Sequence, residues 1–173
     1  MNKLKDEHSR SRETLVEHYR GKYDGENDLP IWMATELLTF GSLSHLYSVL
    51  PLELKRKVAD IIGVDDKILG GWLHSIVYVR NICAHHSRLW NRTLVIRPRC
   101  PKHWPYGKID NAHTYLLLVV LLHILSKIAP RSTWGSRLIR LVDSHAEIDI
   151  EAMGFPSKWK TKEPWRAVNT AWV

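Results

Sequence analysis

The chain has few cysteines, no secretion signal and no apolar run long enough to cross a membrane. Its 173 residues contain two cysteines, Cys83 and Cys100, and its N-terminus lacks the charged start, apolar run and small-residue cleavage site of a signal peptide. These absences argue against disulfides and predict a cytoplasmic protein. The most apolar stretch, Tyr115 to Leu125, has about half of the roughly 20 residues needed to span a bilayer. We therefore expect a buried core helix there and no contact with a membrane.

Acidic residues are missing from one long segment of the chain. No Asp or Glu occurs between Lys67 and Ile109, whereas eight Lys and Arg residues do. The whole chain has 25 basic and 18 acidic residues, so 17 basic and 18 acidic residues lie outside this segment, which holds all of the excess positive charge. Tryptophans and tyrosines alternate with these cations, and such a segment suits a polyanion with stackable bases, either RNA or single-stranded DNA. The alternative is a solvated basic loop. The cations are Lys67, Arg80, Arg88, Arg92, Arg97, Arg99, Lys102 and Lys108.

Internal repeats and low-complexity tracts are also absent, and apolar residues recur mainly at helical spacing. We predict an all-α fold, with one helical bundle over residues 1–173. A loop rich in Pro, Arg and Trp is expected after Trp90, with at most a short extended piece at 94–96. An irregular tail from Phe155 is expected to anchor tryptophans on the bundle. The expected helices are Ser11 to Tyr19, Ile31 to Phe40, Ser42 to Leu50 after a break at Gly41 and Ser42, Leu52 up to Gly63, one that follows Asp65 as its N-cap, Asn111 to Ile128, and Trp134 to Val142; the tail tryptophans are Trp159, Trp165 and Trp172.

The centre of the basic segment is the motif RNICAHHSRLWNR, residues 80–92, at the C-terminal end of the helix that follows Asp65. On a straight helix, at about 100° per residue, Asn81 and His85 share a face, whereas Arg80 and His85 diverge by about 140°. Arg80 therefore meets His85 only if the helix ends or bends near Ala84, or if a second chain completes the site. A helix end also favours a protonated histidine through its negative pole.

These residue types suit RNA cleavage through the ribose 2′-hydroxyl. Such a reaction needs a base, an acid and a cation for the charge on the phosphorane, and histidine and arginine supply them near neutral pH. We assign His85 as general base or acid, Arg80 as phosphate clamp, and Asn81 as orienter of His85 or of a phosphate oxygen. His86 is either the second acid or base or a core residue. We expect no metal and no cofactor. The expected RNA-binding residues are Arg88, Arg92, Arg97, Arg99 and Lys102.

A zinc site is the alternative interpretation of the same segment. Two Cys-x2-His pairs, Cys83 with His86 and Cys100 with His103, are separated by thirteen residues, as in a zinc ligand set. Against this interpretation, Cys83 lies on an apolar helical stripe, where a free cysteine behaves as a small hydrophobe, and the dense positive charge disfavours a dication. Trp90 is interpreted as a packing residue, with base stacking as the alternative.

The motif also carries a family resemblance. Arg80 to His85 matches the R-x4-6-H signature of the HEPN superfamily, and RNICAHHSRLWNR together with PIWMATELLTFGSLSHLYSVL is similar to the Abi-like family of abortive-infection proteins within it. The resemblance spans roughly residues 11–130. It implies a HEPN-like helical bundle and a metal-independent endoribonuclease toxin of phage defence, whose two Arg–His sets face one cleft in a homodimer.

The same resemblance implies a longer family architecture. Members generally carry a helical region before the matched part, so this chain is expected to correspond to a C-terminal part. A toxin of this kind is expected to be restrained by a cognate antitoxin, either RNA or protein. The alternative function is a non-catalytic RNA-binding module regulated by such a partner.

Overall fold

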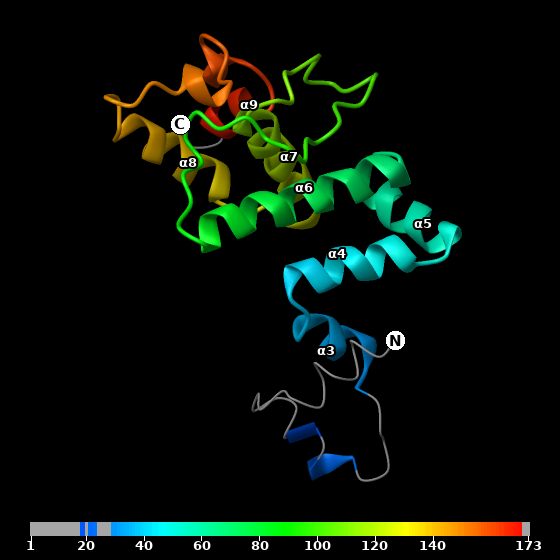
Figure 1. The fold of residues 1–173 in the computed structure, drawn as a ribbon. Coiled ribbons are helices and arrows are strands. Elements are labelled where there is room, and N and C mark those ends of the chain that lie inside the picture. The colour runs from blue at the N-terminus through cyan, green and yellow to red at the C-terminus, as the bar shows by residue number, and fades with distance from the viewer. Residues whose placement is uncertain (1–17, 20, 24–28, 171–173) are drawn as a thin grey trace. The chain divides into compact units, whose positions relative to one another are not determined.

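A computed structural model describes residues 18–19, 21–23 and 29–170 of the chain. Every regular element in these residues is a helix and none is a strand, which confirms the all-α fold (Figure 1). The predicted helix at Ser11 to Tyr19 lies almost wholly outside the described residues. The helices are α3 (Ile31–Glu36), α4 (Phe40–Val49), α5 (Leu52–Ile62), α6 (Asp66–Ala84), α7 (Thr114–Ile128), α8 (Trp134–Asp143), the 3₁₀ helices η1 (Glu151–Met153) and η2 (Trp159–Thr161), and α9 (Trp165–Thr170).

The chain divides into two compact units, Met1–Val49 and Leu50–Val173. A single domain over residues 1–173 therefore stays a prediction. In the first unit, the predicted break at Gly41 and Ser42 is wrong, because α4 begins at Phe40 and includes both residues. The hydroxyl oxygen of Thr39 accepts the backbone N–H of Ser42 at 3.1 Å. This contact satisfies a free donor of the first turn, so the helix begins directly after Thr39.

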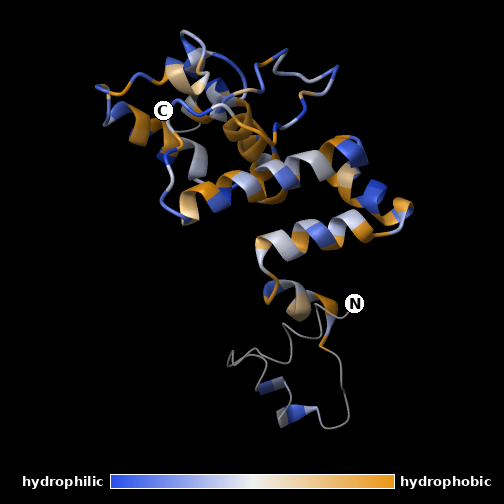
Figure 2. Cartoon of the chain, in the orientation of Figure 1, coloured by the Kyte–Doolittle hydropathy of each residue, from blue (hydrophilic) through white to orange (hydrophobic). Residues whose placement is uncertain are grey.

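The second unit is built around α7, which contacts α5 and α6. Most of α7 is buried, in agreement with the expected core helix, and Figure 2 shows it as strongly hydrophobic. No helix in the described part of the chain has the length and hydropathy needed to cross a bilayer. The buried residues of α7 are Thr114, Tyr115, Leu116, Leu117, Val119, Val120, Leu122 and His123.

Local signals set the bounds of α5 and α6, as the sequence predicts. Pro51 precedes α5, and Gly63 ends it in the left-handed conformation with φ 79°. Asp65 then caps α6, since its Oδ1 accepts the backbone N–H of Lys67 at 2.8 Å. Two helices are thus joined through a tight corner at 63–65, which forms one wall of the pocket described below.

The C-terminal tail anchors aromatic side chains in the second unit, as predicted. Phe155, Trp159 and Trp165 are buried, and the rings of Trp159 and Trp165 pack edge to face at 5.1 Å. The tail is more regular than expected, because it contains η2 and α9. Trp172 lies outside the described residues.

Candidate functional site

The helix α6 ends inside the motif, at Ala84. His85 caps it and donates its backbone N–H to the carbonyl of Asn81 at 3.0 Å. The backbone N–H of His86 bonds to Cys83, and that of Ser87 to Ile82, each at 3.0 Å. These two bonds form a Schellman motif, in which the residue after the cap usually is glycine. Here it is His86, with φ 53°, a conformation that costs a non-glycine residue roughly 1 kcal/mol.

The four proposed catalytic side chains are all exposed at this helix end. The Nη1 of Arg80 donates to Oδ1 of Asn81 at 3.2 Å, while the backbone of Asn81 holds His85. Among the described contacts, no hydrogen bond joins Arg80 to the ring of His85. Asn81 therefore links Arg80 and His85: its side chain accepts from Arg80, and its backbone carbonyl accepts from His85. The exposure of His86 makes the interpretation of it as a core residue wrong.

The loop after the motif is fixed to the second unit at several points. Leu89 packs against a buried cluster that contains Val79 and Leu117. Trp90, which is 41% exposed, donates its indole N–H to the carbonyl of Asp149 at 2.9 Å. This contact favours the packing role expected for Trp90. These contacts hold the positions from which Arg88 and Arg92 extend.

The chain then returns along α6 to the opposite end of that helix (Figure 1). The indole N–H of Trp72, in the second turn of α6, donates to the carbonyl of Arg99 at 2.8 Å. The 19 residues of α6 give it a length of roughly 27 Å. The basic segment therefore forms two separate clusters. One is the motif end of α6, with Arg80, Asn81, His85, His86, Arg88 and Arg92; the other contains Arg99 and Lys102. Arg97 lies between them in sequence, and its Nε donates to the carbonyl of Leu94 at 2.9 Å.

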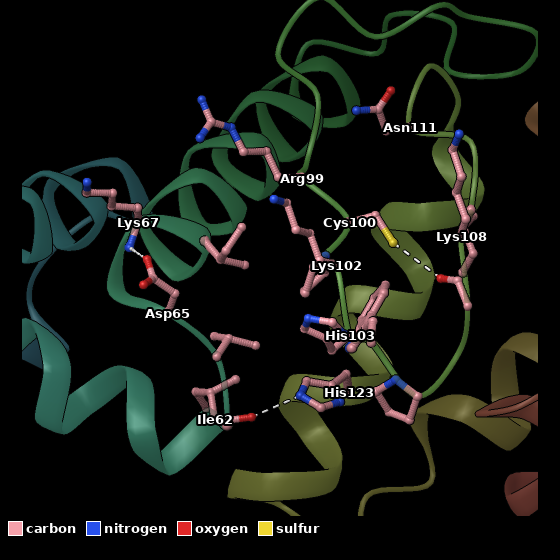
Figure 3. A pocket seen from close by; sticks show the side chains of 18 of the residues that line it. Ile62, Asp65, Lys67, Arg99, Cys100, Lys102, His103, Lys108, Asn111 and His123 are labelled. Atoms are coloured by element: carbon pink, nitrogen blue, oxygen red, sulfur yellow. Dashed lines mark hydrogen bonds between the residues drawn. The ribbon is translucent and has the colours of Figure 1, made fainter.

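The second cluster lines an open pocket of about 1550 Å³, here named the basic pocket (Figure 3). Its wall consists of the corner between α5 and α6, the loop at 99–111 and the second half of α7, which contributes His123 and Lys127. In the pocket, Lys127 joins cations of the basic segment. No short-range pattern marks Lys127, because it comes from the last turn of α7, far from the basic segment in sequence. The cations of the basic pocket are Lys67, Arg99, Lys102, Lys108 and Lys127.

A neutral histidine lies at the inner wall of the basic pocket. The Nε2 of His123 donates to the carbonyl of Ile62 at 2.9 Å, and its Nδ1 accepts from the hydroxyl of Tyr106 at 3.0 Å. These partners fix the tautomer. Burial lowers the pKa of His123, and the charge of Lys127 lowers it further. The rings of Trp72 and Trp104 pack against the same imidazole at 5.8 and 5.9 Å. His123 thus joins α5, α7 and the loop without adding charge.

The structure does not assemble the zinc ligand set. Among the described residues, no group of three or more His, Cys, Asp or Glu side chains is placed to hold a metal ion. Cys83 is exposed at the motif end rather than part of an apolar stripe, which corrects the sequence-based expectation. Cys100 lies in the wall of the basic pocket and donates its thiol to the carbonyl of Gly107 at 3.3 Å. The two Cys–His pairs therefore belong to different ends of α6.

A protein-family model, Abi-like protein, matches residues 1–91. The match contains α3 to α6 and nearly all of the motif, and it ends well before the residue 130 expected from the resemblance. The loop of the basic pocket and helices α7 to α9 lie outside it. No curated protein and no solved structure is found to match the chain.

Proposed function

This chain belongs to the Abi-like family, and from that premise we propose that it is a metal-independent endoribonuclease of abortive infection, related to the HEPN superfamily. The observation that carries the proposal is the hydrogen bond from Arg80 to Asn81 at an exposed helix end that also presents His85 and His86. This bond restrains the guanidinium of Arg80 at a helix end where the side chains of His85 and His86 are open to solvent.

The proposed reaction uses the nucleophile that RNA itself carries. One histidine removes the proton of the ribose 2′-hydroxyl, and the 2′-oxygen attacks the adjacent phosphorus. The bond to the 5′-oxygen breaks, and a second acid protonates that oxygen as it leaves. Arg80 binds the non-bridging oxygens in bidentate fashion and offsets the charge that develops on them. The products are a 2′,3′-cyclic phosphate and a free 5′-hydroxyl.

A homodimer would supply both histidines and both arginines to one cleft. Arg80 and His85 are exposed, so each is available to a second copy of the chain. We expect a two-fold dimer by light scattering at micromolar concentration. Mixing Arg80→Ala with His85→Ala protein should restore part of the wild-type rate, because about half of the dimers are mixed and their shared cleft contains one intact Arg80 and one intact His85. A monomer, or a mixture without any rescue, would contradict the shared site.

The chemical proposal is tested with a short single-stranded RNA and a matched RNA that has one 2′-deoxy ribose at the cut site. We expect the first to be cut in the presence of a chelator, with a cyclic phosphate or its hydrolysed monophosphate as product, and the second to resist. Equal cleavage of the deoxy substrate would exclude the 2′-hydroxyl mechanism. Loss of activity in chelator, with recovery on adding zinc, would favour the set Cys83, His86, Cys100 and His103.

Binding without cleavage is the other outcome. RNA that binds but is not cut by any preparation of the full chain would make the protein an RNA-binding module, held or released by a cognate RNA or protein. An antitoxin of either kind would then be found by co-purification with the tagged chain from its own host.

A further inference from the structure

We propose that the basic pocket is a second binding site, separate from the motif end of α6, and that it takes the phosphate groups of a single-stranded RNA. This inference deepens the proposed function and takes from it only the identity of the polymer. Five cationic side chains from three parts of the fold line the pocket: the start of α6, the loop at 99–111 and the end of α7. Four of them, Lys67, Arg99, Lys102 and Lys108, are labelled in Figure 3. Cations around a concave surface create a positive potential there, which concentrates anions.

Within the described part of the chain, none of these five cations forms a salt bridge. The salt bridges among the described residues do not involve Lys67, Arg99, Lys102, Lys108 or Lys127. The pocket therefore presents its cations to an incoming ligand, and that ligand gains charge-assisted hydrogen bonds without having to break existing pairs.

The three carboxylates in the pocket are largely used within the fold. Asp65 caps α6, and Asp110 accepts from Nδ1 of His113 at 2.9 Å and from the backbone N–H of Ala112 at 3.3 Å. The hydrogen bond with His113 is the main cause that lowers the pKa of Asp110. Asp60 is the third carboxylate. Five cations against three acids leave the pocket positive, and two of the acids already have local partners.

The wall that carries the cations is held in place from inside. Arg99 is fixed through its carbonyl to Trp72, and Cys100 through its thiol to Gly107. Trp104, in the same wall, is 7% exposed, and its buried indole N–H has no hydrogen-bond acceptor among the described residues. A buried donor without an acceptor costs roughly 1–3 kcal/mol. The ring stays in the wall through its packing against Trp72, Tyr106 and His123.

The size of the pocket favours a strand over a small molecule. Its volume of about 1550 Å³ exceeds the roughly 300–1,000 Å³ of ordinary small-ligand sites. The roughly 27 Å between the two ends of α6 corresponds to about eight nucleotides at 3.4 Å per phosphate in a stacked strand. A single strand of that length reaches both the motif end and the basic pocket.

The test uses the full chain and a short 2′-O-methyl oligonucleotide, which binds but lacks the nucleophile for cleavage. The double variant Arg99→Glu with Lys102→Glu should weaken binding by about tenfold, and it should reduce the slope of log K against log salt by about 1.4, or 0.7 per lost phosphate contact. The control is Arg137→Glu with Arg140→Glu, which makes the same change in net charge at exposed positions of α8. We expect it to change affinity by less than about twofold. Circular dichroism and thermal unfolding establish that both variants are folded.

Equal losses of RNA affinity in the two double variants, or no loss in either, would overturn the proposal.

Adenosine monophosphate and inorganic phosphate are added as competitors. Competition by either would indicate a site for single phosphate groups, and binding of the oligonucleotide alone would indicate a strand groove; both outcomes support the pocket as a phosphate site. If wild-type protein binds RNA through the basic pocket but cuts no RNA, the proposed function is wrong and the inference stands. If RNA is cut while the Arg99 and Lys102 double variant binds and cuts like the wild type, the inference is wrong and the proposed function stands.

Discussion

The two ends of α6 receive cations from the same acid-free segment, yet they differ in shape and in partners. At the motif end, Arg80, Asn81 and His85 lie exposed around a helix terminus, and Arg80 and His85 are each hydrogen-bonded to Asn81. At the other end, the cations surround a pocket whose inner wall is a buried, neutral His123. We propose the exposed end for the chemistry and the concave end for binding. Because α6 separates the two ends, one stretch of sequence contributes to two different surfaces.

The strongest way to separate the two ends is His85→Ala. It should reduce cleavage on the order of 10²- to 10⁴-fold, because it removes proton transfer, and leave RNA affinity nearly unchanged. The control is the variant His74→Ala, which changes an exposed histidine of the same helix. We expect this variant to cut RNA at the wild-type rate. Rates and affinities are measured on the same RNA. A large loss of affinity in His85→Ala would show that the motif end also carries binding.

The second prediction concerns the guanidinium at the motif end. Arg80→Lys keeps the charge but loses the fork that grips two phosphate oxygens, so we expect a loss on the order of tenfold to a hundredfold in single-turnover rate. Asn81→Ala should reproduce part of this loss, because it removes the acceptor that holds Arg80. Arg140→Lys on α8 is the matched control. Full activity in Arg80→Lys would mean that a positive charge alone is sufficient there.

The third prediction concerns the pocket end and pH. Because burial lowers the pKa of His123 below its ordinary value of 6.5, the unfolded chain takes up a proton that the folded chain resists. The contribution of His123 to stability is therefore complete above pH 6.5 and is lost as the pH falls through the lowered pKa. His123→Gln keeps a donor for Ile62 and an acceptor for Tyr106 but does not titrate. Urea unfolding on both sides of pH 6.5 should show a weaker pH dependence in this variant than in the wild type and in His74→Gln.

The smallest expected effect is at His86. Glycine adopts the left-handed conformation without strain, so His86→Gly should raise the free energy of unfolding by about 1 kcal/mol, or roughly 2–4 °C in Tm. His86→Ala retains the strained backbone and should give no such gain. If both variants lose cleavage while only the glycine variant gains stability, His86 acts in the chemistry. Wild-type cleavage by both would leave His85 as the sole essential histidine of the motif.

The bounds of α5 and α6 were predictable because the signals are local: Pro51 before one helix, Gly63 after it, and Asp65 as the cap of the next. The start of α4 was not predictable in this way. The hydroxyl of Thr39 accepts the backbone N–H of Ser42, and this contact outweighs the helix-breaking tendency of Gly41. The position of the motif at a helix end followed from periodicity.

The basic pocket was not predictable in the same way. It depends on a loop without periodicity that returns to α6 through the contact between Trp72 and Arg99, and on Lys127 from a helix far along the chain. Charge counting located the segment, but only tertiary contacts divide it into two clusters. The Schellman motif at the end of α6 was also not predictable from the sequence, since His86 occupies the position at which Schellman motifs usually have glycine.

The hydrogen bond from Trp90 to Asp149 spans 59 residues of sequence. Ribosomes add about 5–20 residues per second, so roughly 3–12 s pass between the synthesis of its two partners. During that interval the nascent chain contains the complete motif but not the segment that braces its loop. The bracing of the motif end is therefore one of the later events in the synthesis of this protein, and a ribosome that stalls before Asp149 holds a chain whose motif loop still lacks this anchor.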